Sequence, residues 1–405
     1  MNILLIGNGF DLAHGLPTTY NDFLTFLKYI NPDISTSSLK INPELEVLIK
    51  KDDNAKAIQK IKTLTNNNVW YKYFSELDNL SPNWCDFEYE IEYVVKQFEG
   101  FKKLLEKNHE ISLKDLKISI KKKDEIFSLN YDIFETFIQH YISKKFDITE
   151  EEISPNTINT FFVLTFGKKF KSSQPTIYWI YNAIAFEDFI NMISEELKDF
   201  TKSFELYLSY FVNKLEIKPI AFINNLLDDL NLQILSFNYT NTTTKYNKQF
   251  KHLPCFIHGQ AITDEKDNLV LGINETSNSI DPLFTNFRKY FQRVFKNCNF
   301  SYRNWINEIN RYNSGKIIKV GSEIHHLYII GHSLTLSDKN ILNELITIKG
   351  MKTTIYYRSD ENRKELLQNL AAILGYKAFT ELIENKAIIF EKCDFNKTVS
   401  VFKYN

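Results

Sequence analysis

The stretch that decides the fold is ILLIGNGFDLAHGLPTTY, residues 3–20. Its first four residues, Ile3 to Ile6, are all apolar, which is typical of a strand buried on both faces of a parallel sheet. Gly7 and Gly9 follow at once. Because glycine has no Cβ, these residues allow a sharp turn and the close approach of a ligand to the backbone. The stretch therefore predicts a buried strand that ends in a glycine turn.

A helix is predicted directly after this turn. Apolar residues recur at helical spacing from residue 19 onward, and Thr19 and Asp22 stand where a capping box would place them. Strand, glycine turn and helix together are the arrangement with which α/β folds bind nucleotide phosphates, because N–H groups at a helix start attract anions. Gly7, Gly9 and Gly15 do not spell the G-x-G-x-x-G fingerprint, so an ordinary tight turn is the alternative.

Composition narrows the class of protein. The chain has 405 residues and a formal net charge of −1, so no global positive charge points to nucleic acid. The four cysteines lie far apart in the sequence, which argues against a zinc ribbon and a disulfide framework and is typical of a reducing compartment. No apolar run approaches the roughly 18 residues of a transmembrane helix. We therefore expect a cytoplasmic protein outside the membrane.

The apolar pattern predicts an α/β fold with a Rossmann-like, mainly parallel sheet and a large inserted helical lobe. The runs that we expect to be strands are residues 3–6, 232–237, 255–257, 269–271, 327–330, 353–357 and 387–390. Residues 84–105 and 186–215 are expected to be amphipathic helices. We predict that residues 1–30 and 231–405 form the nucleotide-binding core. Residues 31–230 would form the helical lobe, packed on that core.

Three polar motifs stand at the ends of predicted strands. They are LSFNYTNT at 235–242, FIHG at 256–259, and IIGHSL at 329–334, the last followed by Ser337 and Asp338. An Asn after a strand is often only a turn former, and a single His is often structural. Open α/β sheets, however, bind ligands at the carboxyl ends of their strands. Together with the glycine turn, the motifs predict one site at that edge.

The motifs in this order carry a family resemblance. The opening GNGFDLAHGLPTTYNDFL, with FNYTNT, IHG and GHSLxxxD, resembles the bacteriophage abortive infection AbiH family over residues 7–338. The same order is similar, more remotely, to the sirtuin-like fold. There a Gly-Ala-Gly loop, an Asn after a strand, a His-Gly and a Gly-Thr-Ser or Gly-Tyr-Ser turn surround NAD. The resemblance implies a Rossmann-like sheet with a helical lobe, a role in bacterial antiviral defence and, as in sirtuin-like defence proteins, cleavage of NAD.

Three positions depart from the sirtuin-like pattern. Asn8 replaces the usual Ala, Asp11 replaces a Ser, and Thr240 stands where many sirtuin-like proteins carry Asp. The chain also lacks the four-cysteine structural zinc of sirtuin deacetylases, which argues against protein deacetylation.

Two asparagines compete for the position after the strand. The segment IFSLNYD at 126–132 carries Asn130 in the Asn-x-Asp form, whereas Asn238 lies in FNYTNT. We prefer Asn238, because its spacing to His258 suits adjacent strands and FNYTNT is the AbiH-like form. Asn130 remains the alternative.

The resemblance implies a division of roles in an NAD glycohydrolase. His258 would act as a general base, since its reference pKa of about 6.5 suits proton transfer near neutrality. Asn238 would orient the attacking water or the ribose. NAD is the expected substrate and no metal is expected. The residues expected to bind NAD are Gly7, Asn8, Gly9, Phe10, Asp11, Gly331, His332, Ser333 and Asp338.

Two other functions remain open. One is a module that senses a nucleotide without turning it over. The other is a nucleic-acid-directed, nuclease-type effector that uses the basic stretch 117–123 and the Arg and Tyr residues of 288–311, although a solvated helix face would explain these equally. A phage-derived trigger or a partner defence protein is expected, and the sequence leaves open an oligomer.

Overall fold

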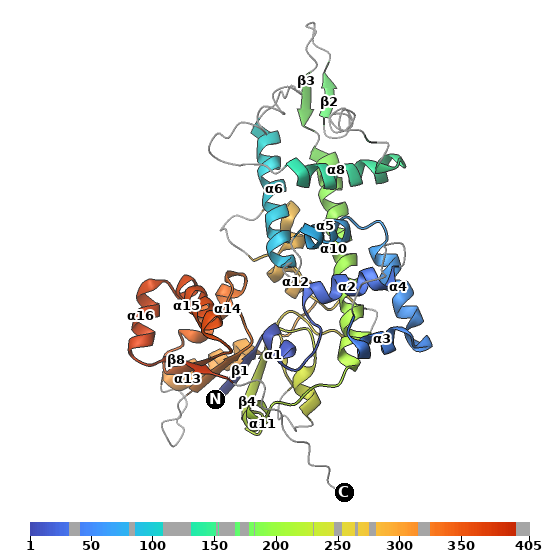
Figure 1. Cartoon of the computed structure of the whole chain (residues 1–405). Helices are drawn as coiled ribbons and strands as arrows, with labels where there is room; N and C mark the ends of the chain where they lie inside the picture. The colour runs from blue at the N-terminus through green and yellow to red at the C-terminus, as the bar shows by residue number, and fades with distance from the viewer. Residues whose placement is uncertain are drawn as a thin grey trace. The chain divides into compact units, whose positions relative to one another are not determined.

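A computed structural model gives the fold of the chain (Figure 1). The residues that it describes are 1–31, 41–80, 86–107, 131–150, 153, 167–170, 178–181, 183–229, 231–246, 253–263, 266–274, 281–314 and 325–393. They form two compact units. The first, the sheet unit, comprises Met1–Lys62, Phe204–Val270 and Arg293–Asn405; the second, the helical unit, comprises Thr63–Ser203 and Leu271–Gln292. The domain division near residues 30 and 230 stays a prediction.

The sheet unit contains six parallel strands. They are β1 (Asn2–Ile6), β4 (Leu232–Ser236), β5 (Cys255–Phe256), β6 (His325–Ile330), β7 (Met351–Tyr357) and β8 (Ile388–Lys392). Their order is β5-β4-β1-β6-β7-β8, and every neighbouring pair is parallel. Renumbered along the chain within this sheet, the order is 3-2-1-4-5-6, which is the doubly wound Rossmann order. The predicted fold class is confirmed, and the switch in strand order falls between β1 and β6.

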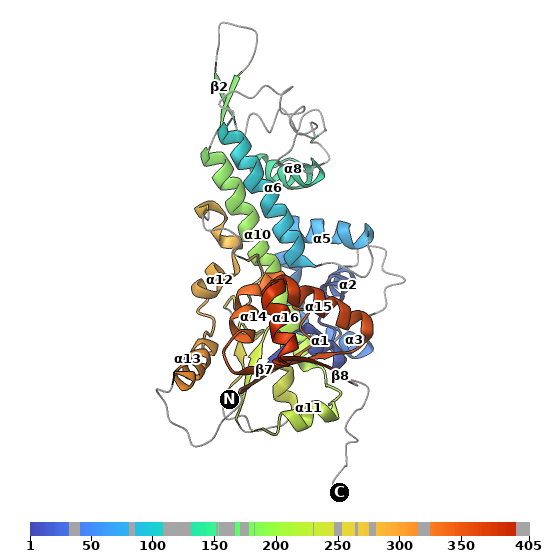
Figure 2. The ribbon, with the colours of Figure 1, turned by 90° about the vertical axis from the view of Figure 1, so that its left-hand side faces the viewer.

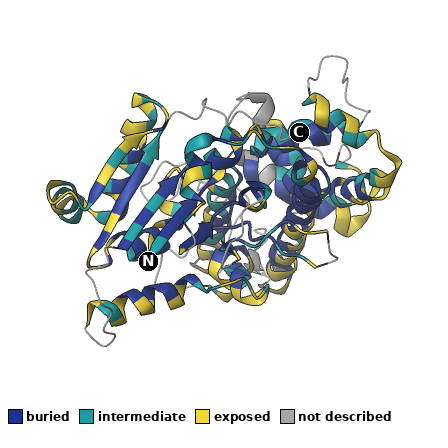
Figure 3. Ribbon diagram, turned by 90° about the horizontal axis from the view of Figure 1, so that it is seen from below, coloured by how far each residue is buried: buried dark blue, intermediate teal, exposed yellow. Residues whose placement is uncertain are grey.

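Strand β1 is buried on both faces, as its unbroken apolar run predicts. Ile3 and Leu5 belong to one hydrophobic cluster, and Leu4 and Ile6 belong to another. Because successive side chains of a strand point to opposite faces, the two clusters are the two faces of the sheet. Figure 3 shows the strands beside the N-terminus as mostly buried.

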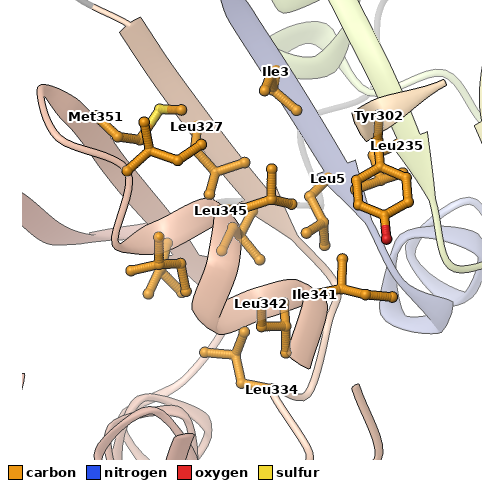
Figure 4. Packing of buried hydrophobic residues seen from close by; sticks show 14 of the residues in the cluster. Ile3, Leu5, Leu235, Tyr302, Leu327, Leu334, Ile341, Leu342, Leu345 and Met351 are labelled. Atoms are coloured by element: carbon orange, nitrogen blue, oxygen red, sulfur yellow. The ribbon is translucent and has the colours of Figure 1, made fainter. Parts of the chain in front are cut away.

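Helices cover both faces of this sheet. The helices and 3-10 turns of the sheet unit, two of them extending past its borders, are α1 (Asn8–Ala13), α2 (Tyr20–Ile30), α3 (Pro43–Ile49), η1 (Asp52–Asn54), α4 (Ala55–Thr65), η3 (Val212–Lys214), α11 (Ala221–Leu226), η4 (Thr242–Tyr246), α12 (Lys289–Phe295), α13 (Tyr302–Asn313), η6 (Leu336–Asp338), α14 (Lys339–Ile346), α15 (Asp360–Leu374) and α16 (Tyr376–Glu384). Helices α13, α14 and α15 share a cluster with Ile3 and Leu5, as Figure 4 shows for α14. Helices α1 and α11 share a cluster with Leu4 and Ile6, and α11 lies opposite α14–α16 (Figure 2).

The capping box predicted for α2 is confirmed. The Asp22 amide donates to Thr19 Oγ1 at 3.0 Å, and the Thr19 amide donates to Asp22 Oδ2 at 2.9 Å. These reciprocal bonds satisfy N–H groups that the first turn of a helix leaves without partners.

The helical unit is built on aromatic packing. Its elements, one of them extending into the sheet unit, are α5 (Val69–Leu80), α6 (Phe87–Lys107), α8 (Tyr131–Phe146), the antiparallel pair β2 (Gly167–Phe170) and β3 (Tyr178–Tyr181), α10 (Ala183–Tyr210) and η5 (Pro282–Phe287). The rings of Phe74 and Phe87 stack at 4.3 Å, and Phe200 contacts both. Helices α6 and α10 confirm the two predicted amphipathic helices with shifted ends. None of the described helices is long and apolar enough to cross a bilayer.

One predicted strand is wrong. Residues 269–271 form no strand, although they are apolar and buried. The Val270 amide donates to the His258 carbonyl at 2.8 Å, and the Val270 carbonyl accepts from the Tyr239 hydroxyl at 2.9 Å. The backbone of this segment is therefore bonded to the loops after β4 and β5 instead of to a neighbouring strand.

Candidate functional site

Each predicted motif follows the carboxyl end of a strand of the sheet unit. Gly7 follows β1, Asn238 follows β4, His258 follows β5 and Gly331 follows β6. Because the strands are parallel, these ends share one edge of the sheet, on both sides of the switch between β1 and β6. Direct contacts connect the four loops.

The loops after β1 and β6 are in close backbone contact. The Gly9 amide donates to the Gly331 carbonyl at 2.8 Å, and the Gly7 amide donates to the Ile330 carbonyl at 3.1 Å. A Cβ on Gly331, which has a φ of +68°, would lie 2.1 Å from the Phe10 nitrogen. The contact between loops therefore requires glycine at these positions. Two amides of the glycine turn are thus bonded within the protein instead of facing outward to a phosphate.

Helix α1 places a carboxyl group inside the site. Asp11 is buried and accepts a hydrogen bond at Oδ2 from the Thr240 hydroxyl, which in turn accepts from Thr242 at 3.2 Å. Burial raises the pKa of Asp11 to about 6, although the hydrogen bonds from Thr240, Thr242 and Asn238 lower it in part. The carboxyl group is therefore poised to gain or lose a proton near neutral pH.

The side chain of Asn238 lies beside this carboxyl group. Its backbone is fixed by Ser236, whose Oγ accepts from the Asn238 amide and donates to its carbonyl, both at 3.1 Å. The Asn238 side chain is close enough to lower the pKa of Asp11. Its amide nitrogen and oxygen, and Asp11 Oδ1, nevertheless have no hydrogen-bond partner of standard geometry among the described residues. Buried polar atoms in this state need a water or a ligand group.

A second polar group joins the ends of β5 and β6. The Nε2 atom of His258 lies 3.2 Å from Asp338 Oδ1, and Nε2 of His332 lies 3.6 Å from Asp338 Oδ2. All three side chains are buried. One carboxylate therefore lies between two imidazole rings.

Phe237 connects the two polar groups. Its ring meets His332 edge-on at 4.6 Å and His258 at 5.4 Å, and the next residue is Asn238. A Cβ on Gly7 would lie 2.9 Å from the Cβ of His332, which brings the glycine turn into the same assembly. We call this assembly, from the glycine turn through His332, His258 and Asn238 to Asp11, the edge site.

The family model for bacteriophage abortive infection AbiH matches residues 3–357, which include every loop of the edge site. The chain belongs to the AbiH family. AbiH is a family of bacteriophage abortive infection, and the protein therefore acts in defence against bacteriophage. The search of curated proteins and the search of solved structures each gave no match.

The carboxylate of Asp338 in this AbiH protein pairs with His258. The sequence grouped Asp338 with the NAD-binding residues, and that role stays a prediction. It stands at the N-cap position of α14, yet its side chain makes no capping hydrogen bond. Asp at an N-cap usually caps the helix. The spacing GHSLxxxD contains the signal, but sequence alone could not separate capping from pairing.

Sequence reasoning missed the hydrogen-bonded pair of His14 and Tyr246 that holds the end of α1. His14 Nδ1 bonds the Phe10 carbonyl at 2.6 Å, so Nε2 of the neutral ring accepts from the Tyr246 hydroxyl. Tyr246 accepts in turn from the Ile220 amide at 3.0 Å. Burial lowers the pKa of His14 and raises the pKa of Tyr246 to about 12. The neutral pair holds the end of α1, and with it Asp11.

Two predicted site residues lie at the margin of the edge site. Asn8 is exposed, and its side chain accepts from the Thr18 hydroxyl at 2.6 Å. Ser333 is exposed, and its carbonyl accepts from the Asn369 side chain at 2.8 Å. The competing Asn130 lies outside the described residues. Within the described residues, no group of three or more His, Cys, Asp and Glu side chains could hold a metal ion.

The basic residues that could bind nucleic acid fall into two groups. The basic stretch 117–123 lies outside the described residues. Arg288 and Lys289 are buried and paired with Glu99 and Glu88, the latter at 2.7 Å. These two cations are poorly suited to bind a phosphate backbone, which needs accessible positive charge, whereas Arg303 and Arg311 of the same segment are exposed.

Proposed function

We propose that this AbiH protein binds NAD at the edge site and hydrolyses the bond between nicotinamide and ribose, so that NAD is depleted during infection. The observation that carries the proposal is the assembly of His258, Asn238 and Asp11 at the carboxyl edge of a sheet in the Rossmann order. An imidazole, an amide and a carboxyl group together can move a proton, orient a water and face positive charge. The sirtuin-like resemblance supports NAD as the ligand.

The proposed reaction consumes one water. Its oxygen bonds to the anomeric carbon of the nicotinamide ribose, and the bond from that carbon to the ring nitrogen breaks. The bonding electrons stay with nicotinamide, which leaves as a neutral molecule, and a proton of the water passes to His258. Asn238 orients the water or the ribose hydroxyls, because positioning lowers the barrier to such a displacement.

Electrostatics suggests how NAD lies along the edge. Asp11 bears negative charge at pH values above about 6, so it would repel a pyrophosphate. The same charge favours the cationic nicotinamide ring and the oxocarbenium-like transition state. We therefore place the nicotinamide ribose near Asp11 and Asn238. The phosphates and the other ribose would contact the exposed Asn8 at the start of α1 and the Gly331–Ser333 loop.

The test combines purified protein with infected cells. Purified protein is incubated with NAD and released nicotinamide is measured by chromatography; cellular NAD and plaque formation are measured in parallel. We expect His258→Ala to lower turnover by roughly 10²- to 10⁴-fold while NAD binding survives. His326→Gln, in the same sheet on β6, is the matched control and should behave like the parent.

The outcomes separate the rival functions. Saturable NAD binding without nicotinamide release, in the test tube and in infected cells, would make the protein a sensor. If His258→Ala protects cells as well as the parent does, and NAD is unchanged in both, NAD hydrolysis is rejected.

A further inference from the structure

Asp338 lies between two histidines, His258 and His332, whose Nδ1 atoms have different surroundings. It lies 3.2 Å from Nε2 of His258 and 3.6 Å from Nε2 of His332, on the two separate oxygens of its carboxylate. A carboxylate facing the Nε2 atom of a neutral imidazole favours the tautomer with the proton on that nitrogen. The question is which histidine is left with a nitrogen for chemistry.

The protein fixes the ring of His332 through a hydrogen bond to Nδ1. Its Nδ1 accepts a hydrogen bond from the Leu334 amide at 2.9 Å, and its Nε2 faces Asp338. An accepting Nδ1 carries no proton, so the proton of the neutral ring is on Nε2. His332 therefore presents its Nε2–H toward Asp338, and its Nδ1 is already engaged by the Leu334 amide.

The backbone at Leu334 supports this arrangement. Leu334 has a φ of +55°, in the left-handed region, and its side chain is fully buried in the hydrophobic core. A bulky residue adopts this conformation only where its surroundings impose it. Here the left-handed turn presents the Leu334 amide to His332 while the side chain stays in the core (Figure 4). The loop after β6 is thus built around the orientation of the His332 ring.

The carboxylate of Asp338 does not cap the helix that it precedes. As the N-cap residue of α14 it would normally accept from the first-turn amides, yet it makes no capping bond. A further contact is the Ser337 hydroxyl, 3.4 Å from Oδ2. The carboxylate therefore faces the imidazoles of His258 and His332, in the loops after β5 and β6, and the Ser337 hydroxyl.

We infer that Asp338 is a positioning residue that holds His258 with Nε2 protonated and leaves Nδ1 as its basic nitrogen, and that His332 anchors Asp338 without exchanging protons itself. The catalytic meaning of this inference rests on the proposed function, because it names the atom of His258 that would accept the proton. The tautomers themselves do not depend on any substrate.

The direct test is the tautomeric state of each histidine in the full-length protein. Protein labelled with ¹⁵N at histidine is examined by long-range ¹H–¹⁵N correlation at a pH where the rings are neutral, and signals are assigned with His258→Gln and His332→Gln. We expect both histidines to show the Nε2–H tautomer in the parent. An Nδ1–H tautomer at His258 in the parent overturns the inference.

Asp338→Asn gives the second arm. The amide that replaces the carboxylate can donate to Nε2, so His258 should change to the Nδ1–H tautomer. Asp360→Asn, in the exposed first turn of α15, is the matched control and should leave His258 unchanged. A folded Asp338→Asn protein whose His258 keeps its tautomer contradicts the positioning role.

Turnover separates this inference from the proposed function. With NAD hydrolysis present, Asp338→Asn should lower kcat by roughly 10²- to 10⁴-fold with KM nearly unchanged, since the basic nitrogen is lost while binding is kept. If the parent releases no nicotinamide but shows the expected tautomers, NAD hydrolysis is overturned and the positioning of His258 is supported. An unexpected tautomer at His258 overturns the positioning role whatever the turnover.

Discussion

The hydroxyl of Thr240 donates a hydrogen bond to the buried carboxylate of Asp11, across the loops that follow β1 and β4. The contact joins two positions that the sequence comparison singled out separately. The sirtuin-like pattern, which the sequence remotely resembles, has Ser at the first and often Asp at the second. On that resemblance, the carboxyl and the hydroxyl group of this pair would stand in the reverse order.

Asp11 predicts how stability depends on pH. Its pKa is about 6 in the folded protein and 3.8 as the reference value for the unfolded chain, so the folded state binds the proton more tightly. The free energy of unfolding should therefore decrease as pH rises from about 4 through 6, by about 3 kcal/mol in total and about 1 kcal/mol between pH 5 and pH 8. Asp11→Asn should remove this slope, and Asp360→Asn should not. Urea unfolding at both pH values measures it; equal slopes in parent and Asp11→Asn would contradict the raised pKa.

Local patterns in the sequence predicted the fold class but not the pairing of side chains. The unbroken apolar run of β1 could be interpreted without tertiary information, and so could the capping box at Thr19. The contact of Asp338 with His258 depends on how β5 and β6 are placed in the sheet, which no local pattern encodes. The strand predicted at 269–271 is wrong for the same reason. Its residues are apolar and buried, but the Val270 backbone bonds to the loops after β4 and β5, and the local pattern does not encode that placement.

Glycine at 331 predicts a measurable packing constraint. Gly331→Ala should lower the free energy of unfolding by at least about 3 kcal/mol, because the new Cβ meets the Phe10 nitrogen in addition to the strain of the left-handed backbone. Gly350→Ala is the matched control: it has a φ of +80°, and the nearest described atom to the new Cβ would be Asn313 Oδ1 at 3.7 Å, an ordinary van der Waals contact. It should lose only the backbone part, about 1 kcal/mol. Equal losses in urea unfolding would show that the contact between loops is loose.

His140 in the helical unit predicts a second pH effect. It lies 2.9 Å from Glu196 and 3.2 Å from Glu150, which are paired with Lys144 and Lys72. Burial alone lowers the pKa of His140, but its bonds to the two glutamates outweigh burial and raise it above 6.5. Its contribution to stability is therefore complete below pH 6.5 and is lost as pH rises through the raised pKa.

Glu150 determines how the stability of this cluster changes at acid pH. The hydrogen bond from His140 is the main reason that the pKa of Glu150 falls to about 2, so its contribution is present above pH 4.5 and is lost as pH falls toward 2. His140→Gln should destabilise the protein by about 1–3 kcal/mol at pH 6 and by less at pH 9. His326→Gln is the control. Thermal or urea unfolding that shows the same loss at both pH values would contradict a charged His140.

The hydrogen-bonded pair Asp11 and Thr240 predicts that two damaging substitutions compensate each other. Asp11→Ser leaves the Thr240 hydroxyl without its acceptor, and Thr240→Asp places two buried carboxyl groups together; each should lower the free energy of unfolding by about 1–3 kcal/mol. The double variant restores one carboxyl and one hydroxyl in the reverse order. It should therefore be more stable than the sum of the single effects predicts, by a coupling of roughly 1–3 kcal/mol.

The matched control for this cycle is Asp11→Ser with Thr244→Val, because Thr244 is exposed and its hydroxyl bonds the Asn241 carbonyl. That combination should be additive. Urea unfolding of the four proteins in each cycle gives the coupling, and plaque assays with the double variant show whether the exchange also keeps antiphage protection. Additive losses in the Asp11 and Thr240 cycle would mean that the two departures are independent. A coupled double variant that also protects cells would show that the edge site needs the carboxyl–hydroxyl pair but not its direction.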